Sequence, residues 1–175
     1  FSGFYKILFY LPAICTSTIV GTVFSKIFET NRGYLNVILR ALHLDFLCQQ
    51  WLATPKTALA CLLFVNIWQW TGYSMLMYYT NMLNIPQDLY ESATIDGAGS
   101  FKQFVYITFP LLRGTHITLI ILDILGALKF FDLSYVLTDG GPAHATETFS
   151  TYIYTKSFST FQQGQASTIV VFMFL

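Results

Sequence analysis

The sequence has 175 residues, of which 54% are hydrophobic and 18% aromatic, while only 10% carry a charge. Soluble globular domains hold about a quarter charged residues, so this composition indicates a membrane protein. The nine basic and nine acidic residues balance to a net charge of zero, which gives no support to nucleic-acid binding.

The first predicted membrane span runs from Ile7 to Phe24, an uncharged apolar stretch between Lys6 and Lys26. Its length is close to the roughly 20 residues that cross a hydrocarbon core. Pro12 lies inside it, and proline is tolerated in transmembrane helices because neighbouring groups satisfy the freed carbonyl. We expect a kink there, which either lines a pathway or serves packing alone.

The next segment, Glu29 to Thr54, carries several charges and the turn residues Asn31 to Gly33, so we expect it to leave the membrane. Residues Tyr34 to Leu44 have the apolar periodicity of a short helix that lies in the membrane interface. Trp51 is expected to be an interfacial anchor, because indole rings concentrate at the headgroup level.

The second predicted span runs from Thr57 to Tyr79 without a charged residue. Asn66, Gln69, Trp70 and Tyr73 are spaced at offsets of three, four and seven, which predicts that they share one helix face. That face should point away from lipid. Two interpretations stay open: the amides join neighbouring helices by hydrogen bonds, or the face lines a path for a sugar-like solute.

A polar region from Ile85 to Pro110 follows the second span. Pro86 suits a first helical position, Gly97 and Gly99 should end that helix, and Ser100 with Gln103 has the spacing of a capping box that opens a second helix. Pro110 should close it. The pattern predicts a helix, a glycine turn and a helix, too polar and too broken to cross a bilayer.

The third predicted span, Thr115 to Phe131, contains Asp123, and a carboxylate within a membrane span marks a functional site, a buried pair or a wet cavity. Ala127 and Phe130 fall on the same face. Ser134 to Gln165 is polar, with a tight corner at Thr138 to Pro142 and His144 as a surface residue. A fourth span should begin at Ala166.

These features predict an all-α polytopic membrane helix bundle of about four spans, forming one domain over residues 1–175. The chain begins at Phe1 without Met and ends inside an apolar run, so we expect a fragment that lacks one or more N-terminal spans and the end of the last span.

Chemistry-bearing motifs are sparse in this sequence. Cys15, Cys48 and Cys61 are odd in number and far apart, which favours structural cysteines over disulfides or a metal site. No glycine-rich loop ending in Lys-Ser or Lys-Thr is present to hold ATP, and no catalytic motif replaces it. We therefore expect no catalytic residue, metal or cofactor in this chain, and an energy source in a partner.

The spacing within the polar region is specific. Glu91-Ser92-Ala93, then Gly97, then Ile107-Thr108-Phe109-Pro110 resembles the Glu-Ala-Ala, Gly, Ile-x-Leu-Pro signature of the permease subunits of binding-protein-dependent ABC importers, with every spacing kept. The chain departs from it at Ser92 and Phe109, both modest changes of size. Ile95 to Ala98 and Thr138 to Pro142 resemble the sugar-importing, maltose-type branch.

This resemblance implies a type I permease core in a prokaryotic inner membrane, with residues 85–110 as its cytoplasmic coupling loop. The partners would be a dimer of ATPase subunits that holds ATP and Mg²⁺, a second permease subunit, an extracytoplasmic sugar-binding protein, a sugar or polyol substrate, and membrane lipid. Contact with the ATPase would involve Glu91, Ser92, Ala93, Asp96, Gly97, Ile107 and Pro110.

In maltose-type members the helices on either side of this loop contact the sugar, so the substrate path would involve Asn66, Gln69, Trp70, Tyr73, Asp123, Ala127 and Phe130. An alternative is an ion-coupled secondary transporter that uses Asp123 as its cation site, although such folds show paired broken helices in two related halves. A membrane enzyme or sensor has support only from the polar loops.

Overall fold

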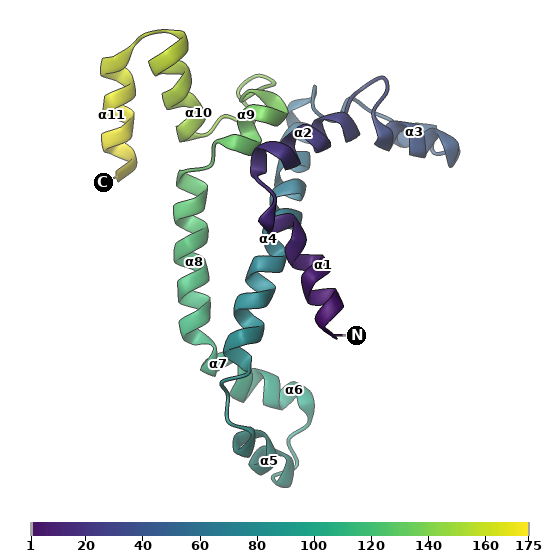
Figure 1. Cartoon of the computed structure of the whole chain (residues 1–175), viewed down its shortest axis with the longest axis vertical. Coiled ribbons are helices and arrows are strands. Elements are labelled where there is room, and N and C mark those ends of the chain that lie inside the picture. Colours follow the sequence, from purple (N-terminus) through teal and green to yellow (C-terminus); the bar gives the residue numbers. More distant parts are fainter. Residues whose placement is uncertain (1, 175) are drawn as a thin grey trace.

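The computed structural model describes residues 2–174, in which helices are joined by turns and irregular segments and no strand is present (Figure 1). Two long antiparallel helices, α4 (Pro55–Met82) and α8 (Arg113–Leu128), form a stem. The remaining helices are α1 (Ser2–Ile14), α2 (Ser17–Ile27), α3 (Tyr34–Ala41), α5 (Gln87–Ile95), α6 (Ser100–Gln103), α7 (Phe109–Leu111), α9 (Asp132–Thr138), α10 (Phe149–Tyr154) and α11 (Gln163–Phe174).

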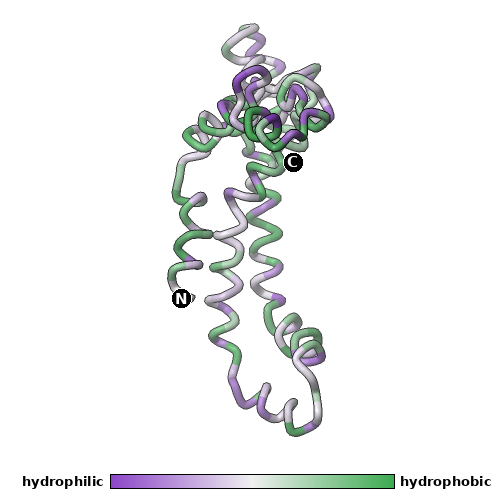
Figure 2. Tube along the Cα trace, turned by 90° about the vertical axis from the view of Figure 1, so that its right-hand side faces the viewer, coloured by the Kyte–Doolittle hydropathy of each residue, from purple (hydrophilic) through white to green (hydrophobic). Residues whose placement is uncertain are grey.

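Three short elements complete the chain: a 3₁₀ turn, η1 (Asp45–Leu47), and two π-helical turns, η2 (Phe104–Thr108) and η3 (Thr155–Ser159). The helices α5, α6 and α7 lie at one end of the stem, and α2, α3, α9 and α10 lie at the other (Figure 1). Hydrophobic residues run along most of the stem, whereas hydrophilic residues are most frequent in the turns at its ends (Figure 2).

The buried core lies at the second end, which we call the cap: residues 17–54, the start of α4, and residues 129–160. Its cluster contains Val20 and Phe28 from the α2 segment, Cys61 and Val65 from α4, and Leu133 and Leu137 from α9. Gly21 permits the close packing of α2 on α9, because a Cβ there would lie 3.0 Å from a methyl carbon of Val136. Burying a side chain such as Leu133 contributes about 1.5–3 kcal/mol, so the cap carries much of the stability of the chain.

The first predicted span, Ile7 to Phe24, is wrong as a single helix. The chain breaks between α1 and α2, and the two helices meet at 94°. Pro12 has no N–H to donate one turn back, and the side chain of Thr16 accepts a bond from the Ile19 N–H at 3.5 Å, which starts a new helix. The Gln69 side chain of α4 then donates to the Cys15 carbonyl at 3.1 Å and satisfies a backbone group that the break leaves free.

The helix α1 also lies unusually close to α4 below this break. A Cβ on Gly72 would lie 1.9 Å from the Phe9 carbonyl oxygen, so only glycine fits at this crossing. Gly72 therefore explains how α1 can pack directly against the α4 backbone.

The other predicted spans correspond to helices. Thr57 to Tyr79 lies within α4, Thr115 to Leu128 lies within α8, and α11 begins at Gln163, three residues before the expected start. By length and apolar composition, no helix between residues 2 and 174 qualifies alone as a membrane span. Two bent pairs do qualify: α1 with α2, and residues Ser100–Leu111 with α8, which are bent by 62°.

The segment between α2 and α4 forms the short helix expected from Tyr34, which ends at Ala41 rather than Leu44. Asn36 is 2% exposed and donates to the carbonyls of Thr30 and Gln49, both at 3.0 Å. Trp51 donates from Nε1 to Asn36 Oδ1 at 2.8 Å and packs against the core cluster. The structure thus ties Trp51 into the cap, while its expected role as an interfacial anchor stays a prediction.

Candidate functional site

Residues 85–110, which we call the docking loop, connect α4 to α8 at the end opposite the cap. They form the predicted helix, glycine turn and helix: α5 ends before Asp96, and Gly97 adopts a φ of +75° before α6 begins. No atom lies within 4 Å of the position of a Cβ on Gly97. Glycine is required here by the left-handed backbone and not by a close approach.

Side-chain hydrogen bonds hold the two arms of the loop together. Gln103 Nε2 donates to Thr94 Oγ1 at 2.9 Å and to the Ala98 carbonyl at 3.1 Å, which bridges the Gly97 turn. The Tyr90 hydroxyl bonds the Thr108 hydroxyl at 2.8 Å. The predicted Ser100–Gln103 capping box is wrong, because Gly99 is the N-cap and Gln103 points back to α5 instead.

Pro110 also differs from its predicted role. It lies in the first turn of α7, where its missing N–H costs nothing, and the chain bends two residues later at Leu112. The helical run therefore continues through the proline.

The predicted coupling residues lie on or near the surface of the loop. Glu91, Ser92, Asp96, Gly97 and Pro110 are exposed, whereas Ala93 and Ile107 are half-buried. Ile95 is 87% exposed and Phe101 is 79% exposed, on opposite sides of the Gly97 turn. Large apolar side chains gathered at an exposed tip mark an interaction surface. Within residues 2–174 the Glu91 carboxylate forms no ion pair, so it is free for a partner.

Three of the four predicted path residues of α4 share a stripe of that helix. Asn66, Trp70 and Tyr73 precede Met77 by eleven, seven and four residues, and Met77 lines a cavity of about 380 Å³ between α4 and α8. The rings of Trp70 and Tyr73 meet edge to face with centroids 6.2 Å apart.

Gln69 lies at the edge of the same face, four residues before Tyr73, but its side chain has other neighbours. It is 1% exposed and turns toward the break between α1 and α2, where Nε2 bonds Cys15 and lies 3.4 Å from Ser17 Oγ. Its Oε1 has no hydrogen-bond partner among the described residues.

The three predicted path residues in α8 and just after it differ from one another in their surroundings. Asp123 lies one turn after the buried Leu119 on the same side of α8. It is exposed and forms no hydrogen bond or ion pair within the described part of the chain. Ala127 is exposed as well, whereas Phe130 packs against the core cluster of the cap. None of the seven predicted path residues lines the cavity between the helices, because this cavity lies nearer the docking loop. Its lining residues are Met77, Asn81, Asn84, Ile85, Pro86, Leu111, Leu112, Gly114, Thr115 and Thr118.

One contact at the base of the stem was not predicted from the sequence. The His116 ring bonds the Tyr78 hydroxyl through Nδ1 at 2.8 Å and the Phe109 carbonyl through Nε2 at 3.1 Å. Tyr78 and His116 are 38 residues apart, and no local pattern pairs them.

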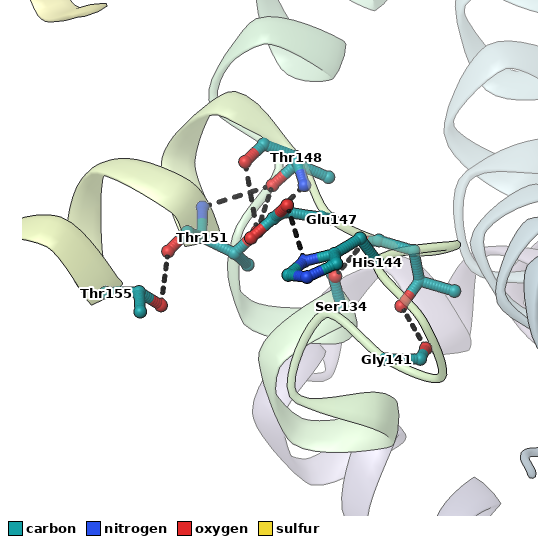
Figure 3. Close-up of polar contacts among 8 residues, drawn as sticks. Ser134, Gly141, His144, Glu147, Thr148, Thr151 and Thr155 are labelled. Carbon is teal, nitrogen blue, oxygen red and sulfur yellow. Dashed lines mark hydrogen bonds and ion pairs between the residues drawn. The ribbon is translucent and has the colours of Figure 1, made fainter. Parts of the chain in front are cut away.

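The polar turn of the cap is held by hydroxyl groups (Figure 3). Thr146 Oγ1 donates to the Gly141 carbonyl at 2.7 Å, and Thr148 Oγ1 donates to the Phe130 carbonyl at 2.6 Å. His144 is exposed, as predicted, and its Nδ1 lies 2.9 Å from a Glu147 carboxylate oxygen. Among the described residues no group of three potential ligands could hold a metal ion, and all three cysteines are free.

Comparison with known proteins gives consistent matches. A family model described as binding-protein-dependent transport system inner membrane component matches residues 1–175. The probable ABC transporter permease protein YurN of Bacillus subtilis (strain 168) is 36% identical over 168 residues, which cover 96% of this chain and 58% of that protein. The lactose transport system permease protein LacF of Rhizobium radiobacter is 32% identical over 160 residues, covering 90% of this chain and 53% of that protein.

The fold also matches a chain of the crystal structure of a bacterial ABC transporter involved in the import of the acidic polysaccharide alginate. The TM-score is 0.86 at 24% identity, and the match covers 96% of this chain and 58% of that one. The present chain therefore spans little more than half the length of these three proteins.

Proposed function

This chain belongs to the family of binding-protein-dependent transport system inner membrane components, and from that premise we propose that it is the permease subunit of an ATP-driven importer of a sugar or related polyol. The observation that carries this proposal is the docking loop, whose signature spacing folds into an exposed helix, turn and helix between the two stem helices. A partner that moves the loop would pull on both stem helices.

The docking loop suits a rigid groove on a separate ATPase subunit, which would hold ATP and Mg²⁺. Ile95 and Phe101 would provide the buried apolar contacts, and Glu91 and Asp96 the polar ones around them. The chain itself would perform no ATP hydrolysis, since its sequence has no phosphate-binding loop.

The proposed substrate class is supported by the names of relatives and by the side chains of the two stem helices. LacF is named for lactose transport, and sugar sites combine polar acceptors with aromatic rings. Asn66, Trp70 and Tyr73 of α4 supply an amide and two rings, and Asp123 of α8 supplies an unpaired carboxylate. We place the substrate path between these two groups, with Gln69 and Phe130 supporting its wall by packing against other parts of the chain.

In this arrangement the chain crosses a prokaryotic inner membrane about four times, with α1–α2 as a bent crossing, α4 and α8 as the next two, and α11 as the last. The docking loop faces the cytoplasm. The cap then faces outward, where residues 29–54 and 134–165 offer a surface for a sugar-binding protein, while a second permease subunit and lipid cover the stem. The ion-coupled alternative has no observation in its favour beyond Asp123 itself.

Uptake of labelled sugars into proteoliposomes tests the proposal. The full-length protein, its partner permease, the ATPase and the binding protein are reconstituted together, with ATP inside the vesicles. We expect uptake that requires ATP and the binding protein and that persists when ionophores collapse ion gradients. Uptake that follows an ion gradient and ignores ATP would establish the secondary transporter instead.

A further inference from the structure

His116 occupies the junction of three elements at the base of the stem. It lies in the first turn of α8, its Nε2 bonds the carbonyl of Phe109 in α7, and its Nδ1 bonds the hydroxyl of Tyr78 in α4. Its ring also packs on the Phe109 ring, with centroids 4.6 Å apart. A single side chain thus touches the docking loop and both stem helices.

The two hydrogen bonds define which nitrogen of the neutral His116 ring carries the hydrogen. A carbonyl oxygen only accepts, so Nε2 must carry the hydrogen that points to Phe109. Nδ1 of a neutral ring is then an acceptor, and the Tyr78 hydroxyl must donate to it. The two hydrogen bonds therefore run in one direction: the Tyr78 hydroxyl donates to Nδ1, and the Nε2–H group donates to the Phe109 carbonyl.

The bond between His116 and Phe109 affects how movement passes along the chain, because it spans a bend. Residues Ser100–Leu111 and α8 meet at 62° around Leu112, and the His116–Phe109 bond crosses that bend. In residues 2–174, these are the only side-chain hydrogen bonds that join α8 to the docking loop or to α4. Nearby, the 380 Å³ cavity lined by Leu111, Leu112 and Thr115 leaves space in which the bend angle could change.

The docking loop, in contrast, is braced within itself. Tyr90 bonds Thr108, and Gln103 bonds Thr94, so both arms would move together when the tip is displaced. Movement of the loop reaches α4 directly through residues 83–86 and reaches α8 through Leu112. Without a brace at the bend, a change of angle at Leu112 would absorb the displacement on the α8 side, and α8 would not move together with α4.

We propose that His116 is a positioning residue that fixes the α7–α8 bend and ties α8 to α4, so that a displacement of the docking loop moves both stem helices as one unit. This inference rests on the proposed function, because it assigns a transmission role to the base of the stem. Neither His116 nor Tyr78 belongs to the predicted ATPase contact or to the proposed substrate path.

The test measures sugar transported per ATP hydrolysed in the reconstituted complex, for Tyr78→Phe, His116→Ala, the double variant and His116→Gln. Tyr79→Phe is the matched control, because Tyr79 follows Tyr78 in α4, lies outside the docking loop, and its hydroxyl forms no hydrogen bond in the described chain. Removing one such bond corresponds to a change of about fivefold. We therefore expect transport per ATP to fall about fivefold in Tyr78→Phe and further in His116→Ala, and to stay unchanged in Tyr79→Phe.

The double variant separates a linked pair from two independent packing residues. If Tyr78 acts only through His116, the double variant should match His116→Ala to within about twofold, whereas independent effects would multiply. His116→Gln keeps one donor and one acceptor and should recover transport per ATP to within about twofold of the wild type.

The inference is overturned if Tyr78→Phe and His116→Ala assemble and couple like the wild type, if their effects multiply, or if they lower coupling only by preventing assembly. Failure of the proposed function would look different, because the wild-type complex itself would then show no ATP-driven uptake.

Discussion

The two ends of the stem are built in opposite ways. The cap contains the apolar cluster of Val20, Val65 and Leu133, together with buried polar residues such as Asn36 that bond the backbone. In the docking loop only Thr108 is buried, and Ile95 and Phe101 are almost fully exposed. The cap stabilises the chain, whereas the loop leaves its apolar side chains free for a partner. Substitutions at the two ends should therefore affect different measurements.

The largest expected effect is on stability, and it belongs to the cap. Leu133→Ala removes a fully buried side chain, and such truncations cost about 2–5 kcal/mol of unfolding free energy. Phe101→Ala in the docking loop should change the unfolding free energy by less than about 0.5 kcal/mol. Thermal or denaturant unfolding of both variants in detergent checks the contrast, and equal destabilisation would refute it.

A smaller loss of stability is expected at the hydrogen-bonded edge of the cap. Asn36→Ala leaves the Trp51 Nε1 and two backbone carbonyls without their partner, which should cost about 1–3 kcal/mol. Asn84→Ala is the control, because Asn84 is an exposed amide near the docking loop. A variant at Asn36 as stable as the wild type would show that the cap does not depend on this residue.

The Gly97 turn should show the reverse pattern, with little effect on stability and a clear effect on coupling. Gly97→Ala forces a Cβ into a φ of +75°, and the exposed turn can relieve this local strain of about 1–2 kcal/mol by changing shape, which lowers the fraction of correctly shaped loops several-fold without unfolding the chain. Gly99→Ala is a close control, since Gly99 has a φ of −68° and open space around it. Transport per ATP should fall for Gly97→Ala and not for Gly99→Ala.

Equal behaviour of the two glycine variants would show that the backbone of the turn is irrelevant to coupling. Gly97→Pro should be more severe than Gly97→Ala, because proline cannot adopt a positive φ.

The smallest expected effect is electrostatic. Glu91→Gln removes an exposed charge that has no partner among the described residues, so the folded chain should be unaffected. A surface ion pair with the ATPase would be worth no more than about 1 kcal/mol and would weaken at high salt. Binding of the ATPase should fall up to about fivefold at low ionic strength, and a loss that does not depend on salt would argue against an ion pair.

The sequence predicted local features better than contacts between distant residues. The helix, turn and helix of the docking loop follow from Gly97 and the short-range spacing, and the structure confirms them, although Pro86 is the N-cap of α5 and not its first helical residue. A kink was expected at Pro12, but a full break of 94° between α1 and α2 was not predicted, and neither was the bond from Gln69 that satisfies the Cys15 carbonyl there, because these residues lie 54 positions apart. Helical periodicity places a residue on a face but does not say which neighbour that face meets.

In the candidate site, too, local helix geometry was predicted better than contacts between distant residues. The positions of Asn66, Trp70 and Tyr73 on one stripe followed from helix geometry, but Gln69 and Phe130 pack elsewhere because α1, α2 and the cap cover them. His116 was missed because its partner lies in another helix, and a single histidine after Gly114 and Thr115 gives no signal of its own.

The central claim is that the docking loop binds the ATPase while the cap holds the chain together. Native mass spectrometry of the purified full-length complex tests it most directly, with wild type and Phe101→Ala compared. We expect two permease chains and two ATPase copies for the wild type, and loss of the ATPase with retention of the partner permease for Phe101→Ala. A wild-type chain that binds no ATPase, or a Phe101→Ala complex that keeps both copies at wild-type strength, would contradict it.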